Sequence, residues 1–156
     1  MDNRVFRDAM GKFATGITVV TTEYKNKVMG MTVNAFMSVS LEPKLIAISI
    51  DEKATMYSKL QETKKFGVSI LKEEQQELSM IFAKQIIKKR DIDFIKNGGI
   101  PVIKDSLATI SCHIKDTIKA GDHMLFIAEV IGLTIDEGEP ILYSGGSYRT
   151  IQPKND

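Results

Sequence analysis

The chain has 156 residues, of which 43% are hydrophobic and 26% charged, and its formal net charge is +1. This length and balance are typical of one globular domain that buries its own core, and they exclude a disordered chain. The near-neutral charge gives no support for binding nucleic acid. A single cysteine, Cys112, excludes an internal disulfide, and with only two histidines we expect no metal centre.

The ends of the chain and its longest apolar runs bear on location. No apolar run is long enough to span a membrane, and the N-terminus lacks the hydrophobic segment of a signal peptide. We therefore expect a cytoplasmic protein without a membrane partner. One domain is expected to cover residues 1–151, followed by a polar tail at 152–156.

The N-terminal part predicts a helix and then a β-hairpin. Apolar residues between Asn3 and Phe13 fall on one face of a helix. Gly16 interrupts this pattern, and the β-branched run at 17–22 predicts a strand. A polar break at 24–27 and a second apolar run at 28–33 complete the hairpin.

The middle of the chain predicts alternating strands and helices. Residues 34–40 are expected to leave the hairpin as a loop, and 45–50 to form a strand. Asp51 is expected to cap the helix that follows. A strand at 66–71 and a second helix at 73–82 come next.

The C-terminal half predicts mainly strands. Residues 84–99 are polar and poorly periodic, and we expect a mixture of helix and loop there. A strand at 108–115 is followed by a turn at 120–123, a long strand at 124–133 and a short one at 141–143. About seven strands with two or three inserted helices disfavour a doubly wound parallel sheet. We predict a mainly β fold: a small, antiparallel β-barrel with a few peripheral helices.

The strand at 108–115 alternates between apolar and polar residues. Cys112 lies on the apolar face, where a buried structural thiol is a better prediction than a nucleophile. Thr109, Ser111, His113 and Lys115 form the other face, which we expect to be wet.

Motifs that would declare an activity are missing. The chain has no dinucleotide-binding glycine fingerprint, Walker loop, zinc-binding helix motif or nucleophile elbow. The stretch from Gly30 to Ser40 mixes small, hydroxyl and amide residues with apolar ones. It fits a strand that ends in an asparagine turn. It also fits a ledge for a flat polar heterocycle, with Thr32 and Asn34 at its edge.

Seven short pieces follow one another along nearly the whole chain: FATGITVVT at 13–21, GMTVNAF at 30–36, SVSLEP at 38–43, SID at 49–51, FA at 82–83, AGDH at 120–123, and PILY at 140–143 with Gly146 and Tyr148. In this order they resemble the short-chain flavin reductase family, the reductase components of two-component flavin monooxygenases. That family belongs to the split-barrel flavin-binding group, so the resemblance implies a split barrel.

The resemblance also implies a set of site residues. Bordering the isoalloxazine it places Thr32, Val33, Asn34 and Ala35, with Ser38 and Val39 nearby. Toward the ribityl chain and phosphate it places Ser49, Ile50, Asp51, Lys53 and Thr55. A helix that starts after Asp51 would offer free N–H groups to a phosphate, and Lys53 a compensating charge. Phe82 and Ala83 would close the pocket.

The resemblance places His123 and Tyr148 against the nicotinamide nucleotide, and His123 is also the one candidate for a catalytic role. Ala35 stands where the family often has serine, and Lys44 where it has a second proline.

The implied activity is that of an NAD(P)H-dependent flavin reductase. Hydride passes from the nicotinamide, of NADH or NADPH, to FMN or FAD, and the reduced flavin diffuses to a partner monooxygenase. The resemblance further implies a homodimer. An electron-transfer flavoprotein that holds FMN without catalysis stays open as an alternative, and so does a split-barrel protein that binds a haem or a pyridoxal-type compound.

Overall fold

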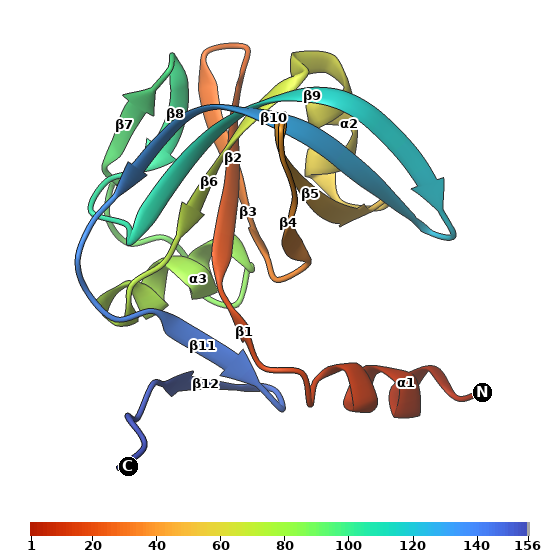
Figure 1. Cartoon of the computed structure of the whole chain (residues 1–156), viewed down its shortest axis with the longest axis vertical. Helices are drawn as coiled ribbons and strands as arrows, with labels where there is room; N and C mark the ends of the chain where they lie inside the picture. The colour runs from red at the N-terminus through yellow and green to blue at the C-terminus, as the bar shows by residue number, and fades with distance from the viewer. Residues whose placement is uncertain (156) are drawn as a thin grey trace.

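A seven-stranded antiparallel sheet, in the order β3-β2-β6-β9-β10-β5-β4, curls into an open barrel (Figure 1). We describe residues 1–155 in a computed structural model. Among these residues the edge strands β3 and β4 are not joined by a hydrogen-bonded ladder, so the barrel is split. The predicted fold class is confirmed. The strands are β2 (Thr18–Tyr24), β3 (Lys27–Val33), β4 (Phe36–Leu41), β5 (Lys44–Asp51), β6 (Lys65–Ile70), β9 (Ala108–Ala120) and β10 (His123–Ile135).

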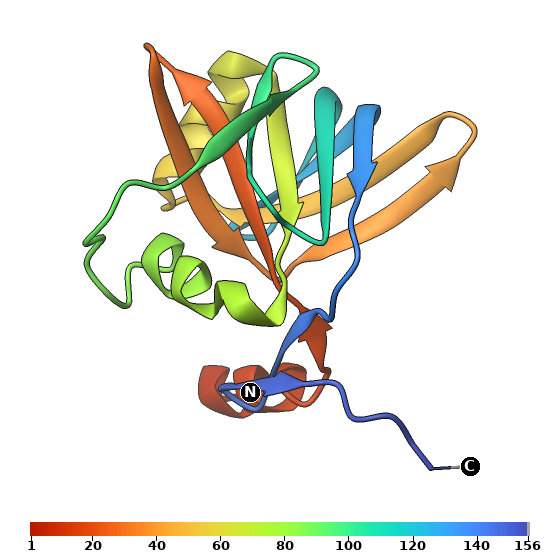
Figure 2. The same cartoon turned by 90° about the vertical axis from the view of Figure 1, so that its left-hand side faces the viewer.

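A second, smaller layer closes one end of the barrel, and we call it the terminal layer (Figures 1 and 2). It brings the two ends of the chain together, because Thr15 pairs with Tyr143 and the Gly145 N–H donates to the Gly11 carbonyl at 2.8 Å. It consists of helix α1 (Asn3–Met10) and the three-stranded sheet β1-β11-β12, whose strands are β1 (Thr15–Gly16), β11 (Ile141–Ser144) and β12 (Ser147–Thr150).

Other elements cover the sides of the barrel. They are α2 (Thr55–Thr63), the 3-10 turn η1 (Glu73–Gln75), α3 (Gln76–Phe82) and the hairpin of β7 (Phe94–Asn97) and β8 (Ile100–Ile103). Figure 2 shows α3 between the barrel and the terminal layer. The barrel core contains Phe66, Phe126 and Leu60, all fully buried. A second apolar cluster joins the barrel to α3 and β11, through residues such as Ile17, Leu78 and Ile141.

Three predicted elements differ from the structure. Residues 36–41 form the edge strand β4 instead of a loop, with a bulge between Ser38 and Ser40. Residues 94–97, in the segment 84–99 that was expected to be helix and loop, form strand β7, which pairs with β8 in a hairpin. Helix α2 begins at Thr55, so Asp51 is not its cap. The Asp51 carboxylate instead accepts a hydrogen bond from the Lys53 N–H at 2.8 Å.

The polar face of β9 is only partly wet. Thr109 and Ser111 are buried, whereas His113 is exposed as expected. Asn97 on β7 explains the difference, because its side-chain amide reaches the hydroxyls of both residues, at 3.1 Å from Thr109 and 3.3 Å from Ser111. The missed β7–β8 hairpin is therefore what covers this half of the face.

Cys112 is a buried free thiol, as predicted. Burial raises its pKa to about 12, so the thiol stays protonated and unreactive near neutral pH. Within the described residues no helix is both long and apolar enough to cross a bilayer. Residues 151–155 are exposed and have no regular structure; Asp156, the last residue of the predicted tail, lies outside the described residues.

Candidate functional site

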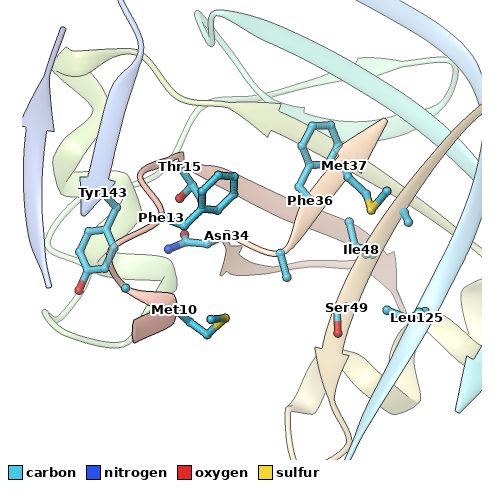
Figure 3. A pocket seen from close by; sticks show the side chains of 13 residues that line it. Met10, Phe13, Thr15, Asn34, Phe36, Met37, Ile48, Ser49, Leu125 and Tyr143 are labelled. Atoms are coloured by element: carbon cyan, nitrogen blue, oxygen red, sulfur yellow. The ribbon is translucent and has the colours of Figure 1, made fainter. Parts of the chain in front are cut away.

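A large cavity lies between the terminal layer and the corner where β3 meets β4 (Figure 3). Its volume is about 720 Å³, within the range of roughly 300–1,000 Å³ that is usual for small-molecule sites. Most of its wall is apolar, which suits a flat aromatic ligand. Its lining residues are Met10, Gly11, Phe13, Thr15, Asn34, Ala35, Phe36, Met37, Ala47, Ile48, Ser49, Leu125 and Tyr143.

A smaller cavity of about 210 Å³ adjoins the first. Asn34 and Tyr143 line both, so they stand at the junction. Hydroxyl and amide groups dominate the smaller cavity, which can therefore bind the polar edge of a ligand. Its lining residues are Ile17, Thr32, Asn34, Ser79, Ala83, Gln85, Tyr143 and Tyr148.

Asn34 is placed at the junction by the turn that ends β3. Its carbonyl accepts a hydrogen bond from the Phe36 N–H at 2.9 Å, which starts β4. Its side chain is exposed, and within residues 1–155 the amide makes no hydrogen bond. An amide without a protein partner at the mouth of two cavities is free to donate to and accept from a ligand.

Strand β5 forms the floor of the larger cavity through Ala47, Ile48 and Ser49. The Ser49 N–H donates to the Ala35 carbonyl at 3.1 Å, which ties β5 to the β3–β4 corner. Side chains alternate along a strand, so Ser49 and Asp51 point to the same face. Asp51 pairs with His123 across the β5–β10 ladder, and Ser49 with Leu125. A ligand that lies on Ser49 can therefore extend along β5 toward Asp51 and His123.

The segment after β5 offers a place for an anionic group. Helix α2 begins at Thr55, and the side chain of its N-cap residue, Ala54, forms no capping hydrogen bond. The N–H groups of the first turn therefore lack a side-chain acceptor, and the helix dipole favours a negative charge there. Lys53 is exposed beside this turn.

His123 lies at the turn between β9 and β10. Its Nδ1 atom is 2.8 Å from the carboxylate of Asp122. The hydrogen bond and charge of His123 hold the pKa of Asp122 below its usual value. Because the carboxyl pKa is lowered, the contribution of the Asp122 carboxylate to this contact is lost only as the pH falls through the folded-state pKa of Asp122. The contact orients the imidazole, and leaves Nε2 for another partner.

The structure brings together six of the residues predicted from the resemblance. They line one or both cavities: Thr32, Asn34, Ala35, Ser49, Ala83 and Tyr148. Asp51, Lys53, Thr55 and His123 lie outside the cavities, at the far end of β5.

Five other predicted residues are placed differently. Val33 and Ile50 have core side chains, so only their backbone can face a ligand. Ser38 and Val39 are exposed on β4 and line neither cavity. Phe82 packs edge-to-face on Phe94, with ring centroids 6.3 Å apart, and lines neither cavity.

The terminal layer supplies lining residues that were not predicted as site residues. Thr15 is the clearest, because its hydroxyl is buried and has no hydrogen-bond partner in the described chain. Tyr143 stands opposite it in the β1–β11 ladder. Both lie in pieces quoted above for the family resemblance, at 13–21 and 140–143, and that was the signal available in the sequence.

Comparison with known proteins gives the family. Residues 10–152 match the model of the flavin reductase like domain. An NADH-dependent flavin reductase from Rhodococcus is 38% identical over 149 residues, covering 94% of this chain and 85% of the relative. The solved structure of flavin reductase PheA2 is 54% identical, with a TM-score of 0.96, covering 98% of this chain and 100% of that one. The styrene monooxygenase flavin reductase from Pseudomonas putida is 34% identical, with a TM-score of 0.90, covering 96% of this chain and 99% of that one.

The chain belongs to the flavin reductase like family. The predicted activity, an oxidoreductase that uses a nicotinamide cofactor to reduce flavin, is confirmed by this membership and by these relatives. The relatives named above are all flavin reductases. They give no support to the two alternatives, an electron-transfer flavoprotein and a split-barrel protein that binds a haem or a pyridoxal-type compound.

The residues present fit a flavin and a nicotinamide. The larger cavity has an apolar wall for a flat ring, and the free amide of Asn34 stands at its polar end. The hydroxyl of Thr15 is a buried polar group that has no hydrogen-bond partner among residues 1–155, so a ligand could provide one. An uncapped helix start with Lys53 suits a phosphate.

Proposed function

We propose that the isoalloxazine ring binds in the larger cavity, with its polar edge at Asn34 and Ala35, and that its side chain runs along Ser49 to Asp51. The terminal phosphate then meets the start of α2 and Lys53. The single observation that carries this proposal is the junction at Asn34, where an apolar and a polar cavity adjoin. A bound flavin accepts a hydride from the nicotinamide, and this chemistry belongs to the two cofactors.

The contribution of the chain is to bind, orient and exclude water. The Asn34 amide is a donor and an acceptor for the ring edge, and the apolar side chains Phe36, Met37 and Leu125 exclude solvent from its face. No side chain in the cavities needs to transfer a proton during the hydride step, in keeping with walls that carry no acidic or basic residue.

The nicotinamide nucleotide is proposed to contact Tyr148 in the smaller cavity and His123 at the far end of β5. NADH is the proposed donor, because the similar Rhodococcus enzyme is named as NADH-dependent. Both FMN and FAD remain candidates for the flavin.

A homodimer is part of the proposal. Helix α1 has no buried residue, and its apolar side chains Val5, Phe6 and Met10, together with Phe13, are 53–79% exposed. An apolar helix face with this exposure requires a cover, and a second copy of the chain is the cover we propose. A stable dimer should bury about 2,000 Å² or more.

The dimer is tested by sedimentation of Phe6→Ser. Wild type should sediment with the mass of two chains, and the variant should shift toward one. Ile87→Ser is the matched control, because Ile87 is also exposed but lies in the polar segment after α3. A wild-type monomer with full activity at micromolar concentration contradicts the dimer.

The proposed destination of the reduced flavin is a separate monooxygenase in the cytoplasm. This is supported by a similar reductase, the one named for styrene monooxygenase. The lone buried thiol suits a reducing compartment.

Binding and turnover with the purified chain test the proposed function. FMN and FAD are titrated separately by fluorescence quenching, and NADH and NADPH oxidation is then followed with either flavin in excess. We expect oxidation of NADH with many turnovers per chain. Tight flavin binding without turnover of free flavin would instead indicate an electron carrier, and no oxidation with any pair would refute the proposal.

A further inference from the structure

Ser79, in the middle of α3, connects the two sides of the smaller cavity. It is only 1% exposed. On one side its carbonyl accepts the Thr32 hydroxyl at 2.7 Å, together with the helical N–H of Ala83 at 3.0 Å. On the other side its hydroxyl shares a hydrogen bond with the Tyr148 hydroxyl at 2.9 Å. One residue thus contacts a proposed flavin-binding residue and a proposed nucleotide-binding residue.

The direction of the Ser79 hydroxyl is informative. Serine is a poorer helix former than alanine, and inside a helix its hydroxyl commonly bonds back to the carbonyl four residues earlier. Here it bonds outward to Tyr148 on β12, across the gap between α3 and the terminal layer. Of the side-chain hydrogen bonds within residues 1–155, it is the one that joins α3 to β12.

This contact fixes the part of Tyr148 that faces the cavity. Because the hydroxyl is held by Ser79, the position of the Tyr148 ring relative to the cavity is set. The ring also meets Tyr143 edge-to-face, with centroids 5.4 Å apart and planes at 69°. Tyr143 lines both cavities, so the orientation set at Ser79 extends through Tyr148 to the junction.

We propose that Ser79 is a positioning residue for the nicotinamide nucleotide. Its hydroxyl holds the Tyr148–Tyr143 pair in the orientation that receives the nucleotide, while its carbonyl holds Thr32 on the flavin side. The inference rests on the proposed contact between Tyr148 and the nucleotide. It assigns to Ser79 no contact with a reacting atom.

The two contacts of Ser79 can be separated experimentally. Ser79→Ala removes the hydroxyl and its bond to Tyr148, but leaves the carbonyl that accepts from Thr32. A positioning role therefore predicts weaker use of NADH with little change in flavin affinity. A general loosening of α3 would weaken both.

The experiment measures KM for NADH, kcat and the flavin Kd for Ser79→Ala, Tyr148→Phe and the double variant. Tyr148→Phe removes the same hydrogen bond from the other side, so it tests the role of this bond even if Ser79→Ala folds poorly. We expect each single variant to raise KM for NADH by about 3- to 10-fold. The double variant should be no worse than either single one, because both remove the same bond. The flavin Kd should stay within about 2-fold.

Ser106→Ala is the matched control. Ser106 is 4% exposed, its hydroxyl donates to the Ile103 carbonyl at 3.0 Å, and it lines neither cavity. It should leave KM for NADH unchanged.

Four results would overturn the inference. If Tyr148→Phe raises KM and Ser79→Ala does not, the role of Ser79 is refuted while the proposed role of Tyr148 stands. If the flavin Kd weakens as much as KM rises, or Ser106→Ala raises KM equally, the role is merely structural. If Tyr148→Phe leaves KM unchanged, the hydrogen bond to Ser79 does not position the ring, and the inference fails while the proposed contact between the ring and the nucleotide stands.

Discussion

The barrel and the terminal layer are built in different ways. In the barrel, long strands pair along their length and enclose fully buried side chains such as Phe66 and Phe126. In the terminal layer, α1 has no buried residue, and Ile141 is the one buried residue of β1, β11 and β12. Few hydrogen bonds join the layer to the barrel, among them the Ile141 N–H to the Leu71 carbonyl at 3.3 Å.

The barrel therefore provides most of the stability, whereas the candidate binding site lies at the boundary between the barrel and the terminal layer. Burial of apolar surface in the barrel provides most of the folding free energy. The cavities lie where the barrel meets the weakly attached layer, and both parts contribute to their walls. Elements of low local stability move most easily, so the layer is the side of the site that can open for a ligand.

The strongest test of this contrast is Phe66→Ala. Phe66 is fully buried in the barrel core, and its loss should lower the free energy of unfolding by about 3–5 kcal/mol. Phe13→Ala is the matched change between α1 and β1, where Phe13 is 79% exposed in the single chain. Both variants are made in the Phe6→Ser background, which weakens the proposed dimer, and there Phe13→Ala should cost less than about 1 kcal/mol. Urea unfolding measures both. A loss from Phe13→Ala similar to that from Phe66→Ala would show that Phe13 contributes to the core of the single chain.

Gly30→Ala tests the packing of α3 on the barrel beside the site. A Cβ on Gly30 would lie 2.6 Å from the Phe82 ring, so the ring must move. We expect a loss of about 1–3 kcal/mol in unfolding free energy, together with weaker flavin binding. Gly16→Ala is the control, because a Cβ there meets no atom within 4 Å. Equal stabilities for the two variants would contradict close packing at Gly30.

Asn34→Leu tests the junction of the cavities. Loss of one hydrogen bond to the ligand should weaken the flavin Kd by about 3- to 10-fold, with little change in thermal unfolding because Asn34 is exposed. Fluorescence titration and thermal unfolding are compared for the variant. A large loss of stability with unchanged flavin affinity would assign Asn34 to the turn alone.

His123→Ala tests the far end of β5. We expect KM for NADH to rise by about 2- to 5-fold with the flavin Kd unchanged. The exposed His113 on β9 provides the control, His113→Ala, which should behave as wild type. Steady-state kinetics at saturating flavin measure the difference. If both variants match wild type, the nucleotide does not contact His123.

The smallest effect concerns the ion pair between Lys72, just after β6, and Asp136, just after β10, whose side chains are 2.6 Å apart. The hydrogen bond from Lys72 holds the pKa of Asp136 below its usual value. The contact therefore stabilises the fold above the unfolded-state pKa, and the contribution disappears as the pH falls through the folded-state pKa. Lys72→Met should be slightly less stable than wild type at neutral pH and equal to it at strongly acidic pH. A difference that persists in acid would exclude ion pairing as the cause.

Local sequence patterns predicted the barrel well and its additions poorly. The β2–β3 hairpin follows the expected runs, with pairs from Thr18 and Val33 to Tyr24 and Lys27. The β7–β8 hairpin was missed because its signal is not local. A proline normally disfavours a strand. Here the carbonyl of Pro101 accepts a hydrogen bond from the Thr21 hydroxyl of the barrel at 2.5 Å. Burial of Thr109 and Ser111 was missed for the same reason.

The site was predictable only in part. The resemblance pointed to Thr32, Asn34 and Ala35, which lie at the end of β3 and in the turn that follows it. Thr15 and Tyr143 were not predicted, because their place depends on a pairing between the two ends of the chain. The helix start after β5 was predicted with the wrong cap, since Asp51 bonds to the Lys53 N–H instead.

The pairing of Thr15 with Tyr143 has a consequence for synthesis of the protein. A ribosome releases the N-terminal strand of this ladder before the barrel strands and its partner after them. The larger cavity is therefore complete only when β11 has paired with β1. Contacts between distant parts of a chain form slowly. We therefore expect this pairing to be a late step in folding, which completes the binding site after the barrel strands have been made.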